Sequence, residues 1–382
     1  MKGIIKGIMR QSIFLSAVLT ALCNCTRSDV DPVGPDTPGE QSDSITGMFL
    51  LNEGNMGTNK CTIDYFDYTT GNYSRDIFTT NNPDVVQALG DCGNDIAVYG
   101  GKVYAVINKS NLVEVMDART FRHIARIEVA NGRNLAFSDG YAYVSSYAGA
   151  ILYQDSKRLG YVAKIDTLTM QVIDSCMVGY QPEEMVVYDG KLYVANSGGY
   201  CDPEYDRTVS VIDLATFTVS KTIDVEINLH RMELDSKRGM IYVSSNGNYY
   251  DIPSSTFVID AKTDKVTGHI EDLPCADMAI SGDSLYVYST EFNYDTYQTI
   301  VSYRIYDIGR NCIVTDHVIT DGTESDIVYP YGIAVNPYNG DMYIADAKDF
   351  MTPGMLYCYG RDGRLKWQFM TGDIPGHFAF LK

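Results

Sequence analysis

Aromatic side chains are concentrated in a few loop-like segments, where they alternate with Asn, Asp and Ser residues. The richest segments are NSGGYCDPEYDR from Asn196, SSNGNYYDIPSS from Ser244 and STEFNYDTYQ from Ser289. A tyrosine combines a large apolar face with a polar hydroxyl, and this combination suits ligand recognition. The predicted ligand-binding residues of these segments are Tyr147, Tyr153, Asn196, Tyr200, Tyr205, Asn246, Tyr249, Tyr250, Phe292, Tyr294 and Tyr297. The alternative for any one tyrosine is that it only packs one long loop against another.

Motifs for catalysis or metal binding are not found in the sequence. The five His residues do not combine with Cys at metal-ligand spacing, and there is neither a phosphate-binding glycine loop nor a nucleophile elbow. Asp202, Glu204 and Asp206 could offer oxygen ligands to Ca²⁺, but their spacing is not that of an EF-hand, and a solvated acidic loop explains them as well. We therefore predict no catalytic residue, no metal and no cofactor.

The aromatic segments connect strands of a repeated sequence unit. PEEMVVYDGKLYVANSGG from Pro182 has a near copy, PYGIAVNPYNGDMYIADAKD, from Pro330. Weaker copies begin at Asn94, Arg133, His230 and Cys275. Each copy contains two alternating apolar segments joined by a Gly/Asp turn, which predicts a β-hairpin. The repeats are 39 to 55 residues apart, which is typical of the four-stranded blade of a β-propeller.

A second hairpin follows most of the first ones, and an aspartate ends its first strand. These residues are Asp117, Asp166, Asp213 and Asp260. An aspartate at this place can accept backbone N–H hydrogen bonds and close the turn. We therefore interpret these carboxylates as structural rather than catalytic.

The two ends of the repeat region complete each other. Residues 47–78 supply three strands without an innermost one, and DIPGHFAFLK at the C-terminus supplies the missing strand, centred on Phe378. Pairing the two ends removes an open sheet edge. The sequence thus predicts an all-β fold, a seven-bladed β-propeller over residues 46–382 with a composite N/C-terminal closing blade.

One residue just before each innermost strand is expected near the mouth of the central channel. These residues are Asp95, Asn134, Glu184, Arg231, Asp277, Gly332 and His377. Because most of them are polar, they could form hydrogen bonds with a ligand seated over the channel, and we add Arg231 and His377 to the predicted ligand-binding residues. The alternative is a water-filled channel lined by solvated groups.

The N-terminal residues have the pattern of an export signal. Residues 1–24 are predicted to be a lipoprotein signal peptide, because Lys2, Lys6 and Arg10 precede an apolar run too short to span a bilayer. The following LCNC resembles a lipobox, with Cys25 as the predicted lipidated residue and Cys23 as the alternative. An ordinary secreted protein is the other alternative. Residues 25–45 are rich in Pro, Gly and Asp and predict a flexible tether.

The net charge restricts the class of partner, and the cysteine content restricts the possible disulfides. The formal net charge is −19, and removing the signal, which holds three positive and no negative charges, makes it about −22. So negative a chain is unsuited to nucleic acid or to an anionic lipid surface. Seven Cys residues follow Cys25, none in a CxxC pair, and their odd number leaves at least one unpaired within the chain.

The repeats VYGGKVYAVINKSNLVEVMDARTF and YDGKLYVANSGG resemble the YVTN/YncE-type propeller proteins. The opening GMFLLNEGNMGTNKCTIDYFDYTTG, together with the lipoprotein signal, resembles a subgroup of outer-membrane lipoproteins of gut anaerobes that includes the BtuG-type surface proteins. The resemblance covers essentially the whole mature chain. It implies capture of vitamin B12 and transfer to a TonB-dependent corrinoid transporter, but it carries no ligand motif that could be transferred residue by residue.

We therefore expect a non-enzymatic lipoprotein, anchored in the outer membrane and facing the cell exterior, that binds cobalamin and related corrinoids on one propeller face. Its expected partners are the corrinoid, the transporter and, through the lipid anchor, the membrane. A surface glycan-binding or adhesion propeller is the first alternative, because tyrosine platforms also bind sugars. A propeller lyase or hydrolase is the second.

Overall fold

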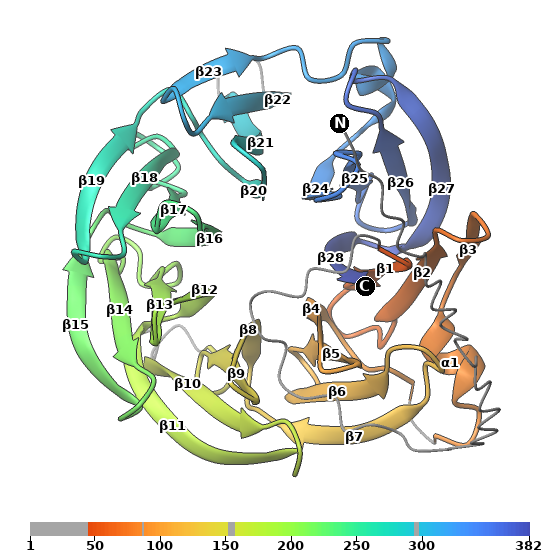
Figure 1. Ribbon diagram of the computed structural model, residues 1–382, viewed down its shortest axis with the longest axis horizontal. Coiled ribbons are helices and arrows are strands. Elements are labelled where there is room, and N and C mark those ends of the chain that lie inside the picture. The colour runs from red at the N-terminus through yellow and green to blue at the C-terminus, as the bar shows by residue number, and fades with distance from the viewer. Residues whose placement is uncertain (1–44, 86–87, 152–156, 294–297) are drawn as a thin grey trace, which may run out of the picture. The chain divides into compact units, whose positions relative to one another are not determined.

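The computed structural model describes residues 45–85, 88–151, 157–293 and 298–382. Within these residues the chain forms seven four-stranded antiparallel sheets, arranged as blades around a central opening (Figure 1). The predicted all-β, seven-bladed β-propeller is confirmed. The predicted signal peptide, tether and lipidation site Cys25 lie outside the described residues.

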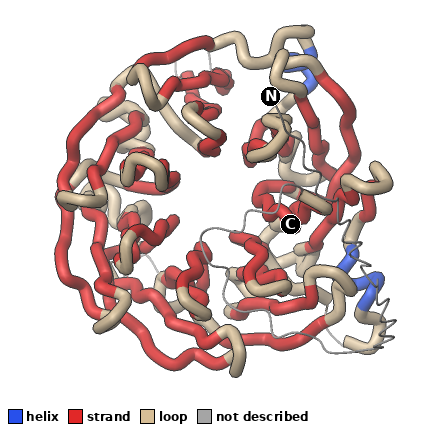
Figure 2. The backbone as a smooth tube through the Cα atoms, in the orientation of Figure 1, coloured by secondary structure: helices blue, strands red, loops and turns tan. Residues whose placement is uncertain are grey.

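Each blade runs from an inner strand beside the central opening to an outer strand at the circumference (Figures 1 and 2). The inner strands are β4 (Gly93–Tyr99), β8 (Gly132–Ser138), β12 (Pro182–Tyr188), β16 (Leu229–Asp235), β20 (Asp277–Ser281), β24 (Pro330–Val335) and β28 (Pro375–Leu381). The second strands are β1 (Gly47–Asn52), β5 (Lys102–Ile107), β9 (Tyr141–Ser146), β13 (Lys191–Asn196), β17 (Met240–Ser245), β21 (Ser284–Asn293) and β25 (Met342–Asp346).

The remaining strands form the outer half of the blades. The third strands are β2 (Thr62–Asp67), β6 (Leu112–Asp117), β10 (Leu159–Asp166), β14 (Thr208–Asp213), β18 (Ser255–Asp260), β22 (Gln298–Asp307) and β26 (Pro353–Tyr359). The outer strands are β3 (Asn72–Ser74), β7 (His123–Glu128), β11 (Gln171–Tyr180), β15 (Thr218–Asp224), β19 (Lys265–Ile270), β23 (Cys312–Thr315) and β27 (Leu365–Asp373). A short helix α1 (Ile77–Asn81) and a 3₁₀ turn η2 (Thr323–Asp326) lie between blades in the chain order.

The closing blade is built from both ends of the propeller, as predicted. β28 pairs antiparallel with β1, from Gly47 opposite Leu381 to Leu50 opposite Phe378. The sheet order is β28-β1-β2-β3, so the last strand of the chain is the innermost strand of the first blade. This pairing closes the ring through a blade made from both ends of the chain, and it covers the edge of β1 that would otherwise be unpaired.

The hydrophobic core is divided among the junctions between neighbouring blades. Each of the seven core clusters among the described residues draws on two adjacent blades. One of them joins Tyr193 of β13 to Ile241 of β17. The Tyr193 hydroxyl also donates a hydrogen bond, with an O···O distance of 2.5 Å, to the carboxylate of Asp264 in the next blade. Tyrosines of the second strands are therefore core residues, since Tyr104, Tyr143, Tyr193 and Tyr343 are buried.

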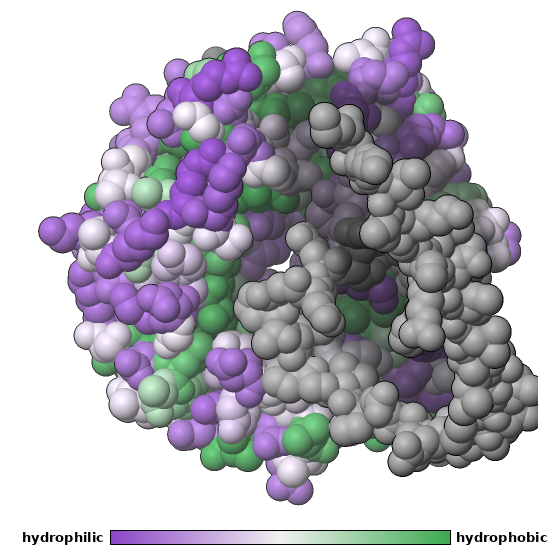
Figure 3. Space-filling model, viewed as in Figure 1, coloured by the Kyte–Doolittle hydropathy of each residue, from purple (hydrophilic) through white to green (hydrophobic). Residues whose placement is uncertain are grey.

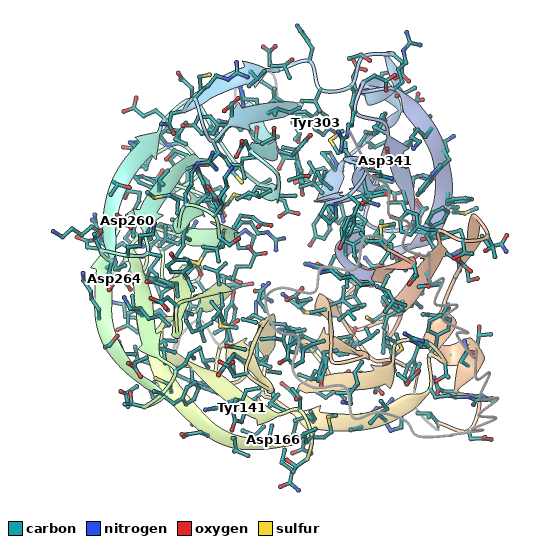
Figure 4. All side chains as sticks on the ribbon, viewed as in Figure 1. Tyr141, Asp166, Asp260, Asp264, Tyr303 and Asp341 are labelled. Carbon is teal, nitrogen blue, oxygen red and sulfur yellow. The ribbon has the colours of Figure 1, made fainter. Side chains whose placement is uncertain are left out.

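The aspartates that end the third strands have the structural role that we predicted. Asp166 accepts the backbone N–H groups of Leu168 and Thr169, both at 2.8 Å. Asp117, Asp213 and Asp260 make the same kind of turn. Figure 4 shows Asp166 and Asp260 near the circumference of the ring, well away from the central opening.

Two further observations concern membrane-spanning helices and the hydropathy of the surface. In the part of the chain that the structure describes, no helix is long and apolar enough to cross a membrane. Hydrophilic residues dominate the visible outer part of the ring in the space-filling view (Figure 3).

Candidate functional site

A cavity of about 800 Å³ lies at the N-terminal ends of the inner strands, and all seven blades contribute residues to its lining. A second cavity, of about 340 Å³, is lined by residues further along the same strands. Arg231 and His377 line both cavities and therefore lie between them. The larger cavity is thus a bowl over one mouth of the central channel.

β-Bulges at the start of the inner strands explain the number of polar groups in this bowl. The pairing register shifts between Gly132 and Leu135 in β8, and between Leu229 and Met232 in β16. A bulge places two successive residues opposite one and changes the direction of a side chain. Arg133 and Asn134 both line the cavity as a result, and so do His230 and Arg231.

The first charged group of the floor is built around Arg133. Its Nε lies 3.2 Å from Oε2 of Glu183, and its guanidinium lies 4.7 Å from the centre of the Tyr147 ring. The Tyr147 hydroxyl donates to the other carboxylate oxygen of Glu183. Burial alone would raise the pKa of Glu183, but Arg133 holds it below its ordinary value. This group presents a fixed positive charge and an ionised carboxylate side by side.

The second charged group surrounds Arg231. Its Nη1 lies 3.0 Å from Glu184 and its Nε 3.4 Å from Asp277, so one guanidinium lies between two carboxylates. Burial, and then the Asp277 charge, raise the pKa of Glu184 to about 7, against the opposing effect of Arg231. Burial also raises the pKa of the neighbouring Glu233, and Glu184 and Asp277 add to that shift. The deeper channel therefore holds more acidic groups than its one arginine can neutralise.

The third group joins the closing blade to its neighbour. Nε2 of His377 lies 2.9 Å from Oε1 of Glu53, and the Tyr331 hydroxyl donates to Oε2 of Glu53 at 3.0 Å. Both partners are held by one carboxylate from the loop after β1. The floor as a whole therefore offers hydrogen-bond donors and acceptors in fixed positions, which suits recognition of a polar ligand.

Five exposed apolar side chains line the cavity above this floor, and we call them the apolar rim. They are Met56, Tyr249, Tyr250, Ile252 and Phe292. Tyr250 is 83% exposed, Met56 66% and Phe292 50%. Apolar groups clustered in this way at a concave surface are typical of a binding site, because exposing them to water is unfavourable unless a partner covers them.

Six of the predicted ligand-binding residues line this cavity, and they come from three blades. They are Asn246, Tyr249, Tyr250, Phe292, Arg231 and His377. Phe292 lies in a strand rather than in the predicted loop, because β21 extends to Asn293. Tyr153, Tyr294 and Tyr297 lie outside the described residues.

The other four predicted residues do not line the cavity. The Asn196 amide is buried and donates to Thr208 Oγ1 and Ser210 Oγ, both at 3.0 Å, so it holds its own loop together. Tyr147 is also buried, beneath Arg133, and supports the floor instead of facing a ligand. Tyr200 is exposed beside Tyr147, and half-buried Tyr205 lies near Asp202.

Sequence reasoning missed several lining residues. They include Glu53, Met56, Arg133, Glu183, His230, Tyr288 and Tyr331. Arg133, Glu183, His230 and Tyr331 each stand one position before a residue that we had assigned to the channel mouth. Their position directly before the predicted mouth residues is the signal in the sequence that could have identified them. The sequence does not show the bulge that allows both successive residues to line the cavity.

Gly247 shapes the loop that carries Tyr249 and Tyr250, and we expect Gly247→Ala to destabilise the protein. Gly247 has a φ of +61°, and an added Cβ would lie 1.9 Å from the carbonyl oxygen of Ile252. We expect a loss of about 1–3 kcal/mol in the free energy of unfolding, measured by urea denaturation. Gly282→Ala is the matched control, because Gly282 has a φ of +62° with open space around it. Equal losses in both variants would contradict a steric role for Gly247.

The fold and the site together define the class of protein: a seven-bladed β-propeller with a cavity over its central channel, large enough for a small-molecule ligand. Residues 46–359 match the family described as "Domain of unknown function (DUF5074)", and the chain belongs to that family. None of the curated proteins was found to match it. Among the described residues there is no group of three or more His, Cys, Asp or Glu residues that could hold a metal ion.

Solved structures share the fold at low sequence identity. A structure described as Kuenenia stuttgartiensis hydrazine synthase matches with a TM-score of 0.55 and 16% identity, over 71% of this chain and 77% of that chain. Apo AztD from Citrobacter koseri matches with a TM-score of 0.52 and 10% identity, over 88% of this chain and 98% of that chain. A chain of the mitotic checkpoint complex matches with a TM-score of 0.52 and 12% identity, over 88% and 96%. At these identities the similarity shows the fold alone.

Proposed function

We propose that the protein is a cell-surface lipoprotein that binds cobalamin and related corrinoids and passes them to a TonB-dependent transporter of the outer membrane. The observation that carries the proposal is the cavity of about 800 Å³, in which an apolar rim stands above a charged, hydrogen-bonding floor. Small-molecule sites usually have volumes of about 300–1,000 Å³, so this cavity suits a large ligand.

The chemistry of the cavity matches the two surfaces of a corrinoid. A corrinoid is a broad macrocycle fringed with amides, so it needs apolar contact for the ring and hydrogen bonds for the fringe. Tyr249, Tyr250 and Phe292 offer aromatic faces to the ring. Glu53 and Glu183 can accept hydrogen bonds from amide N–H₂ groups, and Arg133 can donate to amide carbonyls.

The location and the partner in this proposal rest on the N-terminal sequence and on the resemblance to BtuG-type surface proteins. A lipid on Cys25 and a tether up to residue 45 would hold the propeller at the membrane surface. The negative net charge favours solubility and repels polyanions. A TonB-dependent corrinoid transporter would then receive the ligand from a protein that performs no chemistry on it.

Calorimetric titration of cyanocobalamin into purified residues 26–382 tests the proposal. We expect one-to-one binding, and we expect Tyr249→Ala and Tyr250→Ala each to weaken it about 10- to 100-fold, equivalent to about 1.4–2.8 kcal/mol. The reason is that each change removes an aromatic face from the rim. Tyr200→Ala is the matched control, because Tyr200 is 63% exposed but does not line the cavity.

Absence of binding by both cyanocobalamin and cobinamide at micromolar protein would contradict the corrinoid proposal. Equal weakening by Tyr200→Ala and Tyr250→Ala would place the site elsewhere on the propeller. Recovery of a chemically changed corrinoid after incubation would contradict the non-enzymatic role and favour a lyase or hydrolase.

Glycan binding is the second candidate, favoured by the exposure of Tyr249 and Tyr250 at the cavity. Such tyrosine platforms also stack against sugar rings. Competition separates the two candidates, since an oligosaccharide that displaces no cyanocobalamin but binds alone would indicate a separate function.

A further inference from the structure

Two histidines line the larger cavity, and only His377 is held by a neighbouring side chain, Glu53. His230 lies in β16, is partly exposed and lines the larger cavity. Within the described residues, its ring nitrogens make no hydrogen bond. By contrast, Glu53, Arg133, Glu183 and His377 are all held by neighbouring side chains. An imidazole without a partner at the floor of a cavity has a nitrogen available to a ligand.

The surroundings of His230 keep its imidazole neutral. Burial and the adjacent charge of Arg231 lower the pKa of His230 to about 3, and Arg133 acts in the same direction against Glu183. A neutral imidazole keeps a nitrogen lone pair, which makes histidine a common ligand of transition metals. Lone-pair donation by His230 is therefore available throughout the physiological pH range.

The other imidazole and the thiols of the cavity are less suited to bind a metal. Nε2 of His377 is already engaged by Glu53 at 2.9 Å. The thiols of Cys92 and Cys275 would have to ionise first, because the thiolate is the metal ligand. Burial raises the pKa of Cys92 to about 11, and burial raises the pKa of Cys275 as well. His230 is thus the lining residue with the most accessible nitrogen donor.

We propose that the imidazole of His230 is an axial ligand of the cobalt ion of a corrinoid bound in this cavity. This inference rests on the proposed function and deepens it. The step is a ligand exchange on Co(III): the cobalt–water bond breaks, the imidazole nitrogen donates its lone pair to form a new bond, and water leaves. No electron is transferred and no proton is released, because the imidazole is already neutral.

Aquacobalamin and cyanocobalamin test this inference because they differ in the axial position. Aquacobalamin carries an exchangeable water there, whereas cyanocobalamin carries a firmly bound cyanide. When aquacobalamin is titrated into residues 26–382, we expect its visible absorption bands to shift as they do with free imidazole. Cyanocobalamin should bind without such a shift. We expect His230→Gln to abolish the shift and to weaken aquacobalamin binding about tenfold more than cyanocobalamin binding.

Two controls separate coordination from a structural role. His317→Gln should leave the shift unchanged, because the His317 side chain is 90% exposed and does not line the cavity. Free imidazole should restore the shift to aquacobalamin bound by His230→Gly, which a merely structural role would not predict. If cyanocobalamin binds but wild-type protein causes no shift, or if His230→Gln keeps the shift, the inference is overturned and the proposed function stands. If neither corrinoid binds, the proposed function itself fails.

Discussion

Deletion of residues 375–382 is expected to abolish cooperative folding of the propeller. The deletion removes β28, which pairs along β1 and packs between the inner strands β24 and β4. Ala379 and Leu381 are part of one core cluster, and Phe378 and Phe380 pack against another. Losing one strand therefore opens two blade junctions at once. We expect a loss comparable to the whole stability of a domain, about 5–15 kcal/mol, seen by circular dichroism as the absence of a cooperative melting transition.

Removal of Lys382 alone is the control for this deletion. Lys382 is exposed and follows the end of β28, so we expect an unchanged melting temperature. A truncated protein that still melted cooperatively at the wild-type temperature would show that the ring does not depend on its composite blade.

Replacement of Arg231 by Met is expected to cost about 3–5 kcal/mol of unfolding free energy at pH 8. The Arg231 side chain is 12% exposed, and its guanidinium is the partner of both Glu184 and Asp277. Without it, two partly buried carboxylates lose their compensating charge. Urea denaturation at pH 8 measures the loss.

The same variant should lose less free energy of unfolding at pH 5 than at pH 8, because the pKa of Glu184 is raised in the folded state. Burial and Asp277 raise its pKa to about 7 from an ordinary value of 4.5, although Arg231 opposes them. A carboxyl with a raised pKa in the folded state contributes stability that is fully present below pH 4.5 and is lost as the pH rises through 7. Removing the arginine charge strengthens this dependence, because only protonation can then neutralise Glu184.

Two further variants check this explanation. Arg310→Met removes an ion pair with Asp307 whose arginine is 74% exposed, and it should cost less than about 1 kcal/mol. Adding Glu184→Gln to Arg231→Met should restore part of the lost stability at pH 8, because it removes one of the unpaired charges. A pH-independent loss, with no recovery in the double variant, would mean that Arg231 acts through packing alone.

The fold could be predicted because its determinants are local in the chain. Alternating apolar residues define each hairpin, as in PEEMVVYDGKLYVANSGG, and a turn aspartate such as Asp166 closes the next one. The composite blade could also be predicted, since residues 47–78 lack an inner strand and the segment around Phe378 has the matching pattern. An unpaired strand edge is unfavourable, so the two ends of the propeller are expected to pair with each other in one blade.

The site could be predicted only in part, because lining a cavity is a property of three-dimensional packing. Composition selected the segment with Tyr249 and Tyr250, and the structure places both residues at the cavity. The same argument selected Asn196 and Tyr147, which are buried and bonded to their own surroundings. A loop sequence shows which groups are present, but neighbouring loops decide which of them remain exposed.

By itself, the sequence determined the all-β class, the seven blades and the closure of the ring, because these follow from alternation and strand pairing. The tertiary structure decided which side chains meet over the channel. The bulges place Arg133 and His230 in the cavity beside the residues that follow them, and the convergence of distant blades joins Glu53 to His377 across 324 positions of the chain. Such contacts depend on the twist and curvature of the whole ring, which no local pattern encodes.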